Sequence, residues 1–189
     1  MKNEITYVFW GLVLAVCLFQ SSSQGRANAA NSGNTGAPGE LTTCITCHGT
    51  SAGIQVDLNI EAKDADGEVV TEYEPEATYN LKVSIDATMG SPSAYGFQMV
   101  SINAPVDVDG AAINDWVNAS DNARIINLPA NNRTYVEHKG PSNTNEFTVQ
   151  WKAPTAGSGV VTFYACGNGV NLGGSTAGDN AACNTLVFN

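Results

Sequence analysis

The chain has 189 residues, of which 8 are basic and 18 acidic, giving a formal net charge of −10 at neutral pH. This length is enough for one domain with a sizeable core. The acidic balance argues against nucleic acid and anionic membrane surfaces as partners. A protein partner would therefore have to offer a basic docking face.

The segment 1–29 has the form of a cleaved secretory signal. Lys2 precedes an apolar run at 7–19, YVFWGLVLAVCLF, which is too short to span a bilayer comfortably. A polar stretch follows, and ANAA at 27–30 has the A-x-A form of a signal-peptidase site. An uncleaved membrane anchor is the alternative. We expect cleavage after Ala29, no membrane attachment afterwards, and a secreted protein that is periplasmic, cell-surface or extracellular.

The segment NSGNTGAPGE at 31–40 is small, polar and rich in Gly and Pro, which predicts a flexible arm at 30–43. After it the chain alternates apolar and polar residues in short runs separated by Gly, Pro, Asn and Asp. This pattern predicts an all-β antiparallel sandwich, with helical turns near 112–117 and at the C-x-x-C-H described next. The expected strands are 54–60, 68–73, 79–85, 95–102, 123–128, 133–138, 146–153, 159–166 and 184–189.

The stretch TTCITCHGT contains a C-x-x-C-H motif made by Cys44, Cys47 and His48. In a c-type haem site two thiols form thioethers with the two vinyl groups of the porphyrin, and a helical turn sets the spacing between them. The histidine that follows then serves as the proximal ligand of the iron. The motif therefore predicts one covalently bound haem c in a domain at 44–189.

Other chemistries stay open for this motif. A zinc site needs two further ligands, and the other thiols left after Cys17 departs with the signal are Cys166 and Cys183, separated by a Gly/Asn-rich loop. A redox C-x-x-C needs a strand leading into a helix that lowers a thiol pKa, whereas a Gly/Pro-rich arm precedes this one. A local disulfide or a chance match is the remaining alternative.

The chain has two histidines, His48 and His138. With His48 as the proximal ligand, His138 at the end of an expected strand is the leading candidate for the distal position. Met89, in a turn-rich loop, and Met99, in a strand where a core position is the default, are alternatives. Because one of the two histidines belongs to the motif, we expect no Ser/His/Asp arrangement and no hydrolase chemistry.

Several separated stretches resemble secreted bacterial domains of the Reeler-like, choice-of-anchor type. The likeness begins with TGAPGELTTCITCHG at 35–49 and a Y-x-P-x-x-x-Y-x-L stretch at 73–81. It continues in the same order with GFQM at 96–99, YVEH at 135–138, WKAP at 151–154 and GVVTFYACGNGVN…GSTAGDN at 159–180. The similarity covers nearly the whole chain after the predicted signal.

The resemblance implies an immunoglobulin-like, Reeler-like β-sandwich whose short N-terminal arm carries the haem-attachment turn. It places a histidine where His138 stands, which supports His138 as the partner of His48 across the haem. Cys166 and Cys183 fall where relatives commonly carry other residues, and we interpret them as an added disulfide that braces the last hairpin, worth about 3 kcal/mol. A further departure lies at 75–76, where Pro-Glu stands instead of the frequent Pro-Gly.

The sequence therefore predicts a secreted monohaem c-type cytochrome for electron transfer. Two axial histidines would fill both axial positions, so we expect an electron carrier rather than an enzyme. Its partner would be a redox protein with a basic docking face or another copy of the chain, with self-assembly through the N-terminal arm as a further alternative. The alternative is an extracellular binding or adhesion module whose C-x-x-C-H is a disulfide or a metal clip.

Overall fold

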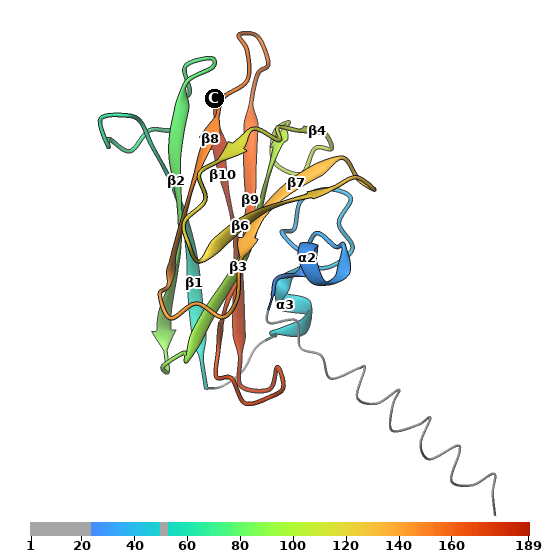
Figure 1. The fold of residues 1–189 in the computed structure, drawn as a ribbon, viewed down its shortest axis with the longest axis vertical. Coiled ribbons are helices and arrows are strands. Elements are labelled where there is room, and N and C mark those ends of the chain that lie inside the picture. The colour runs from blue at the N-terminus through green and yellow to red at the C-terminus, as the bar shows by residue number, and fades with distance from the viewer. Residues whose placement is uncertain (1–23, 50–52) are drawn as a thin grey trace, which may run out of the picture.

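A computed structural model describes residues 24–49 and 53–189, which form two layers of strands with a helical arm at one side (Figure 1). The arm carries two short helices, α2 (Arg26–Ala30) and α3 (Cys44–Cys47). The strands are β1 (Gln55–Lys63), β2 (Thr78–Met89), β3 (Ala94–Asn103), β4 (Ala111–Ala112), β5 (Trp116–Val117), β6 (Ala123–Leu128), β7 (Arg133–His138), β8 (Glu146–Lys152), β9 (Val161–Val170) and β10 (Asn180–Phe188).

The strands form two sheets in which neighbouring strands pair antiparallel. The first sheet has the order β1-β2-β8-β5, and the second has the order β10-β9-β3-β7-β6 with β4 beside β3. Each sheet buries one face against the other, which is the stable arrangement for strands with one apolar face. The all-β antiparallel sandwich predicted from the alternating sequence is confirmed.

The core lies between the two sheets and is built from alternate residues of each strand. In β1, Val56, Leu58 and Ile60 are buried, whereas the residues before each of them are exposed. Trp151 of the first sheet and Phe163 of the second meet edge to face, with ring centroids 4.9 Å apart. Each large apolar side chain buried in this way contributes about 1.5–3 kcal/mol, so this layer supplies much of the stability of the fold.

The arm covers the outer face of the second sheet. A second apolar cluster forms there from Ala27 and Ala37 of the arm and from Val100, Tyr135 and Tyr164 of the sheet, among others. Strand β3 is consequently buried on both faces. In Figure 1 the two helices of the arm lie together at this side of the sandwich.

The segment 30–43, expected to be flexible, is packed against the sheet. Asn34 and Thr35 are 3% and 1% exposed. Asn34 N donates to Gln98 Oε1 at 2.6 Å, and its side-chain amide donates to Thr42 Oγ1 at 2.7 Å. Small polar residues let the backbone approach the strands and satisfy its polar groups there, and composition alone does not separate this arrangement from a solvated linker.

Two local predictions are wrong. Residues 112–117, expected to form a helical turn, contribute instead to β4 and β5, because Trp116 pairs with Trp151 and its indole Nε1 donates to Thr134 O at 3.1 Å. Burial of a large aromatic ring in the sandwich outweighs a weak local helix preference. Residues 68–73, expected to form a strand, are irregular.

The predicted signal at 1–29 lies mostly outside the described residues, which begin at 24. The part that is described leads into α2 and packs on the sandwich. Over the ranges 24–49 and 53–189, no helix has the length and apolarity needed to cross a membrane.

Candidate functional site

The C-x-x-C-H motif forms the single helical turn α3, which packs beside β9 and β10. Thr43 is the N-cap residue, and its backbone N–H donates to Thr46 Oγ1 at 3.1 Å. The turn closes with a hydrogen bond from His48 N to Cys44 O at 2.9 Å. Capping and packing together hold a four-residue helix that would not persist alone.

The two thiols of the motif are unbonded. Cys44 is half-buried, with Sγ 3.7 Å from Asn34 O, and Cys47 is exposed. Burial raises the pKa of the Cys44 thiol to about 12, and the charges of Glu40 and Cys47 act in the same direction. A thiol that stays protonated is a poor nucleophile for disulfide exchange. In the described part of the chain, no group of three or more His, Cys, Asp or Glu side chains is arranged to hold a metal ion.

His48 follows the turn and is held by Asp179. Its Nδ1 lies 3.0 Å from Asp179 Oδ2, and Asp179 is 4% exposed. The other carboxylate oxygen of Asp179 accepts a hydrogen bond from Asn171 N at 2.9 Å. In the tautomer with the proton on Nδ1, His48 donates to the carboxylate and its Nε2 lone pair is available to a metal.

His138 ends β7 at the point where this strand separates from β3. The pairing of the two strands stops at Gln98 and Glu137. At the next residue the His138 side chain contacts the Phe97 backbone in place of strand pairing, with Nδ1 3.0 Å from Phe97 O and 3.1 Å from Phe97 N. When Nδ1 donates to Phe97 O, the Nε2 atom of His138 is available as a ligand in the same way as that of His48.

The ring of His138 reaches the outer face of the second sheet over Gly96. A Cβ on Gly96 would lie 3.0 Å from His138 Cε1 and 2.8 Å from Asn168 Oδ1, so a side chain there would displace the ring. Burial lowers the pKa of His138, the hydrogen bond with Phe97 opposes this, and the charge of Arg124 lowers the pKa further. Gly96 pairs with Asn168 of β9, and the Asp179 that holds His48 bonds Asn171 just beyond the same strand, so the two histidines lie at one end of β9.

The two methionines considered as alternative ligands lie in different environments. Met99 is fully buried in the core between the sheets, and Met89 is exposed at the end of β2 in the first sheet. Burial in the core keeps Met99 away from a ligand at the surface, whereas His138 shares one end of β9 with His48.

The disulfide predicted between Cys166 and Cys183 is confirmed. The two residues stand opposite each other on β9 and β10 and are bonded. The hairpin that this bond closes carries Asp179 just before β10 begins. The disulfide therefore braces the segment that holds His48 in place.

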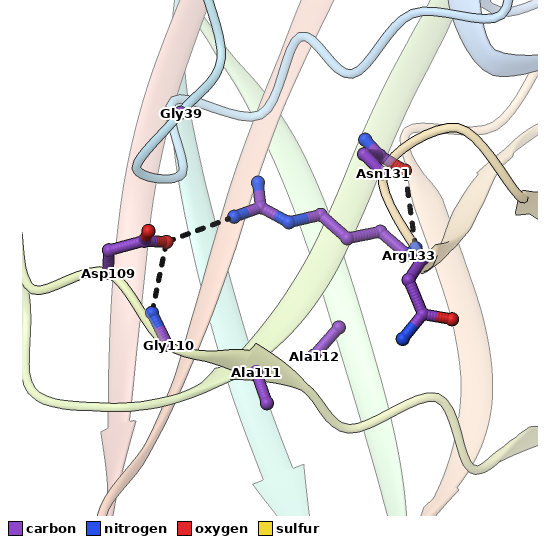
Figure 2. A pocket seen from close by; sticks show the side chains of 8 residues that line it. Gly39, Asp109, Gly110, Ala111, Ala112, Asn131 and Arg133 are labelled. Atoms are coloured by element: carbon purple, nitrogen blue, oxygen red, sulfur yellow. Dashed lines mark hydrogen bonds and ion pairs between the residues drawn. The ribbon is translucent and has the colours of Figure 1, made fainter.

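A pocket lies beside the start of β7, and Figure 2 shows Arg133 extending across it toward Asp109. The Arg133 guanidinium donates to Pro38 O at 2.7 Å and lies 3.7 Å from Asp109 Oδ1. Its charge is thus already partnered. Because Arg133 begins the strand that His138 ends, the pocket and His138 lie at opposite ends of β7.

Two residues of this region have no role assigned from the sequence. Asp179 stands in a Gly-rich loop and Glu137 on a strand, and acidic side chains are normally solvated. Both are buried, at 4% and 0% exposure. The packed arm and the position of α3 over β9 and β10 explain both.

Comparison with known proteins agrees with this fold. A sequence model of the Reeler domain matches residues 67–166, a span that includes His138 and Cys166 but begins after the C-x-x-C-H turn. No curated protein matches the chain.

Three solved structures of F-spondin domains are similar in fold. Fragment 1 of the human F-spondin reeler domain is 17% identical, with a TM-score of 0.46 over 75% of this chain and 95% of that one. Fragment 2 is 19% identical, with a TM-score of 0.39 over 57% and 76%. The Reelin-N domain of F-spondin is 17% identical, with a TM-score of 0.42 over 69% and 86%. The family model spans more than half of the sequence, and the chain belongs to the Reeler domain family.

Proposed function

We propose that the protein is an exported monohaem c-type cytochrome that transfers electrons. Cys44 and Cys47 would hold one haem c by thioether bonds, and His48 and His138 would ligate its iron. The observation that carries this proposal is the pair of histidines at the same end of β9, each with Nδ1 hydrogen-bonded, beside a turn with two unbonded thiols.

The residues present fit a covalently held haem. The hydrogen bond of His48 to the Asp179 carboxylate favours the tautomer with the proton on Nδ1, which leaves Nε2 as the ligand. His138 Nδ1 contacts both Phe97 O and Phe97 N, and donation to the oxygen would leave its Nε2 as the ligand. Around the turn, Leu41 is 98% exposed and Ile45 is 43% exposed. Large apolar side chains left in water are a surface that an apolar group such as a porphyrin can cover.

When bound, the haem supplies an iron that alternates between the ferric and ferrous states. Cys44 and Cys47 would tether the haem, and His48 and His138 would ligate its iron. An iron with both positions filled favours the passage of electrons over reaction with oxygen or peroxide. The protein is on this basis an electron carrier rather than an enzyme.

The charge of the chain suits a protein partner of opposite sign. A net charge of −10 favours a redox partner with a basic docking face and disfavours nucleic acid and anionic membranes. Another copy of the chain is the second partner that we consider. Export to the periplasm, the cell surface or the medium is part of the same proposal.

The visible spectrum of the protein, produced together with the haem-attachment machinery, tests the proposal. We expect a Soret band, a pyridine-haemochrome signal and an intact mass increased by one haem per chain. A colourless protein with both motif thiols unmodified would end the cytochrome hypothesis.

A binding or adhesion module is the second candidate. It is favoured by the family match at 67–166, which leaves the motif outside the conserved domain. In that case the C-x-x-C-H is a disulfide or a metal clip. Mass spectrometry separates the two candidates, because a loss of two hydrogens at Cys44 and Cys47, in place of a haem adduct, supports the clip.

A further inference from the structure

A buried carboxylate anchors the start of the arm. Glu137 is 0% exposed, and its two oxygens accept hydrogen bonds from Ala27 N at 2.8 Å and Asn28 N at 3.0 Å. Gln98 Nε2 donates to the same carboxylate at 3.2 Å. The two backbone groups therefore supply part of the hydrogen bonding that this carboxylate needs once water is excluded.

The residues around Ala27 and Asn28 are held in place together with them. Ala27 is fully buried, and Gly25 packs so closely on Glu137 that a side chain there would collide with the carboxylate. Ala29 N donates to Gly25 O at 3.1 Å, and the Arg124 guanidinium contacts Gln24 O. This segment packs as part of the domain, although its A-x-A pattern is typical of the end of a secretory leader.

We propose that residues 25–30 belong to the exported, folded domain and that any leader cleavage falls before Gly25, rather than after Ala29 as the A-x-A pattern predicts. Cleavage is a hydrolysis in which water adds across one peptide bond, the C–N bond breaks, and the exported chain starts with a new α-ammonium group. A cut after Ala29 would remove both backbone donors and the residues that cover Glu137, leaving as its partners Gln98 and Arg124, whose Nε lies 3.4 Å from Glu137 Oε1.

Packing explains why the residues of this segment are small. Gly25 and Ala27 lie against the sheet and Glu137, where a larger side chain would not fit. The same small residues give the segment its resemblance to a cleavage signal. Upstream, Ser21 and Ser23 provide small residues at alternate positions, which is the pattern that signal peptidase accepts. The inference does not depend on the haem.

The first test is the N-terminus of the exported protein. The full chain with its own leader is produced in an exporting host and examined by N-terminal sequencing and intact mass. We expect the exported protein to begin at Gly25 or at an earlier residue. An uncleaved chain would also support the proposal, because it keeps residues 25–30. A chain starting at Asn28 or Ala30 would overturn the proposal.

A matched pair of variants tests the cut directly. Ala29 and Ala30 are both exposed, so the domain tolerates a larger side chain at either position. Ala29→Tyr blocks a cut after residue 29 because the position before the cut must be small, whereas Ala30→Tyr does not. We expect both variants to be processed at the wild-type position, and loss of processing in Ala29→Tyr alone would contradict the inference.

Thermal unfolding provides a readout that does not involve processing. A chain that begins at Ala30, exported behind a borrowed leader, is compared with one that begins at Gly25. We expect the shorter chain to unfold several degrees lower, because it leaves Glu137 without two of its donors. Equal unfolding midpoints would show that residues 25–29 are dispensable and would refute the proposal.

Discussion

His48 Nδ1 lies 3.0 Å from Asp179 Oδ2, and this carboxylate is 4% exposed. A histidine that donates to a buried carboxylate is a more basic ligand than one that donates to water. A more basic ligand, with a negative charge behind it, favours the higher oxidation state of a bound iron. The strength of this hydrogen bond is therefore a control on the redox potential of the proposed haem.

Replacing the carboxylate by an amide should raise that potential. Asp179→Asn keeps the shape of the side chain and the acceptor for Asn171 N, but removes the charge. A charge-assisted hydrogen bond is worth about 1.5–3 kcal/mol, and 59 mV corresponds to a tenfold change for one electron. We expect a rise of about 65–130 mV in a spectroelectrochemical titration. Asp66→Asn, in an exposed turn, removes the same charge as a control, and equal potentials in both variants would argue against the role of Asp179.

The distal ligand is tested by removing His138. His138→Ala should convert a low-spin visible spectrum to a high-spin one, since one axial position loses its ligand. Met89→Leu and Met99→Leu should leave the spectrum unchanged, because Met89 is exposed on the first sheet and Met99 is buried in the core. An unchanged spectrum in His138→Ala would remove that residue from the coordination shell.

Gly96 should matter through its contact with His138. In Gly96→Ala the new Cβ would meet His138 Cε1 at 3.0 Å, so we expect the ring to shift and the high-spin fraction to grow. Gly140→Ala is the matched control, because a Cβ there has no neighbour within 4 Å among the described residues. Indistinguishable spectra for the two variants would mean that the close approach at Gly96 does not position the ring.

The disulfide should stabilise the fold without being needed for haem attachment. Replacing both Cys166 and Cys183 by Ala should lower the free energy of unfolding by about 3 kcal/mol, which corresponds to a fall of about 6–12 °C in Tm. The covalent haem should remain, as seen by haem staining, whereas Cys44→Ser with Cys47→Ser should abolish it. Retained staining in the second double variant would disprove covalent attachment at the motif.

Glu40 should make the protein more stable in mild acid than at neutral pH. Burial raises the pKa of Glu40 above its ordinary value of 4.5, although hydrogen bonds from Thr35 and Tyr135 oppose this; Arg133 Nη1 lies 3.8 Å away. The native state then binds this proton more tightly than the unfolded chain does. The stabilising contribution is full below the unfolded pKa and is lost as the pH rises through the folded pKa.

Urea unfolding at pH 5 and pH 7 measures this contribution. Glu40→Gln should flatten the pH dependence relative to the wild type, because its amide does not titrate. Glu68→Gln, at an exposed position, should leave the dependence as it is. If the wild type and Glu40→Gln differ by the same free energy at both pH values, the titration of Glu40 does not contribute.

Alternation predicted the strands well where one face meets the core and the other meets water. The predicted ranges 123–128 and 133–138 coincide with β6 and β7. What alternation does not reveal is what covers the outer face of a sheet. Residues 31–40 look like a linker in composition, yet they lie on β3 and bury it on both sides.

The candidate site was predictable only in part, for a chemical reason. Haem attachment requires two thiols and a histidine at fixed spacing, so Cys44, Cys47 and His48 stand out locally, and the scarcity of histidine singles out His138. Asp179 has no comparable local pattern. Its importance arises from a contact with His48 that joins two segments far apart in the sequence, and such a contact becomes visible only in the folded chain.

The position of the disulfide also bears on how four thiols are sorted during maturation. Cys166 and Cys183 are 17 residues apart and directly opposite each other on one hairpin. Hairpins form within microseconds, long before oxidation is complete, so these two thiols meet as soon as the hairpin exists. A disulfide formed early between these two removes them from competing pairings, which leaves Cys44 and Cys47, far earlier in the chain, available for the proposed haem.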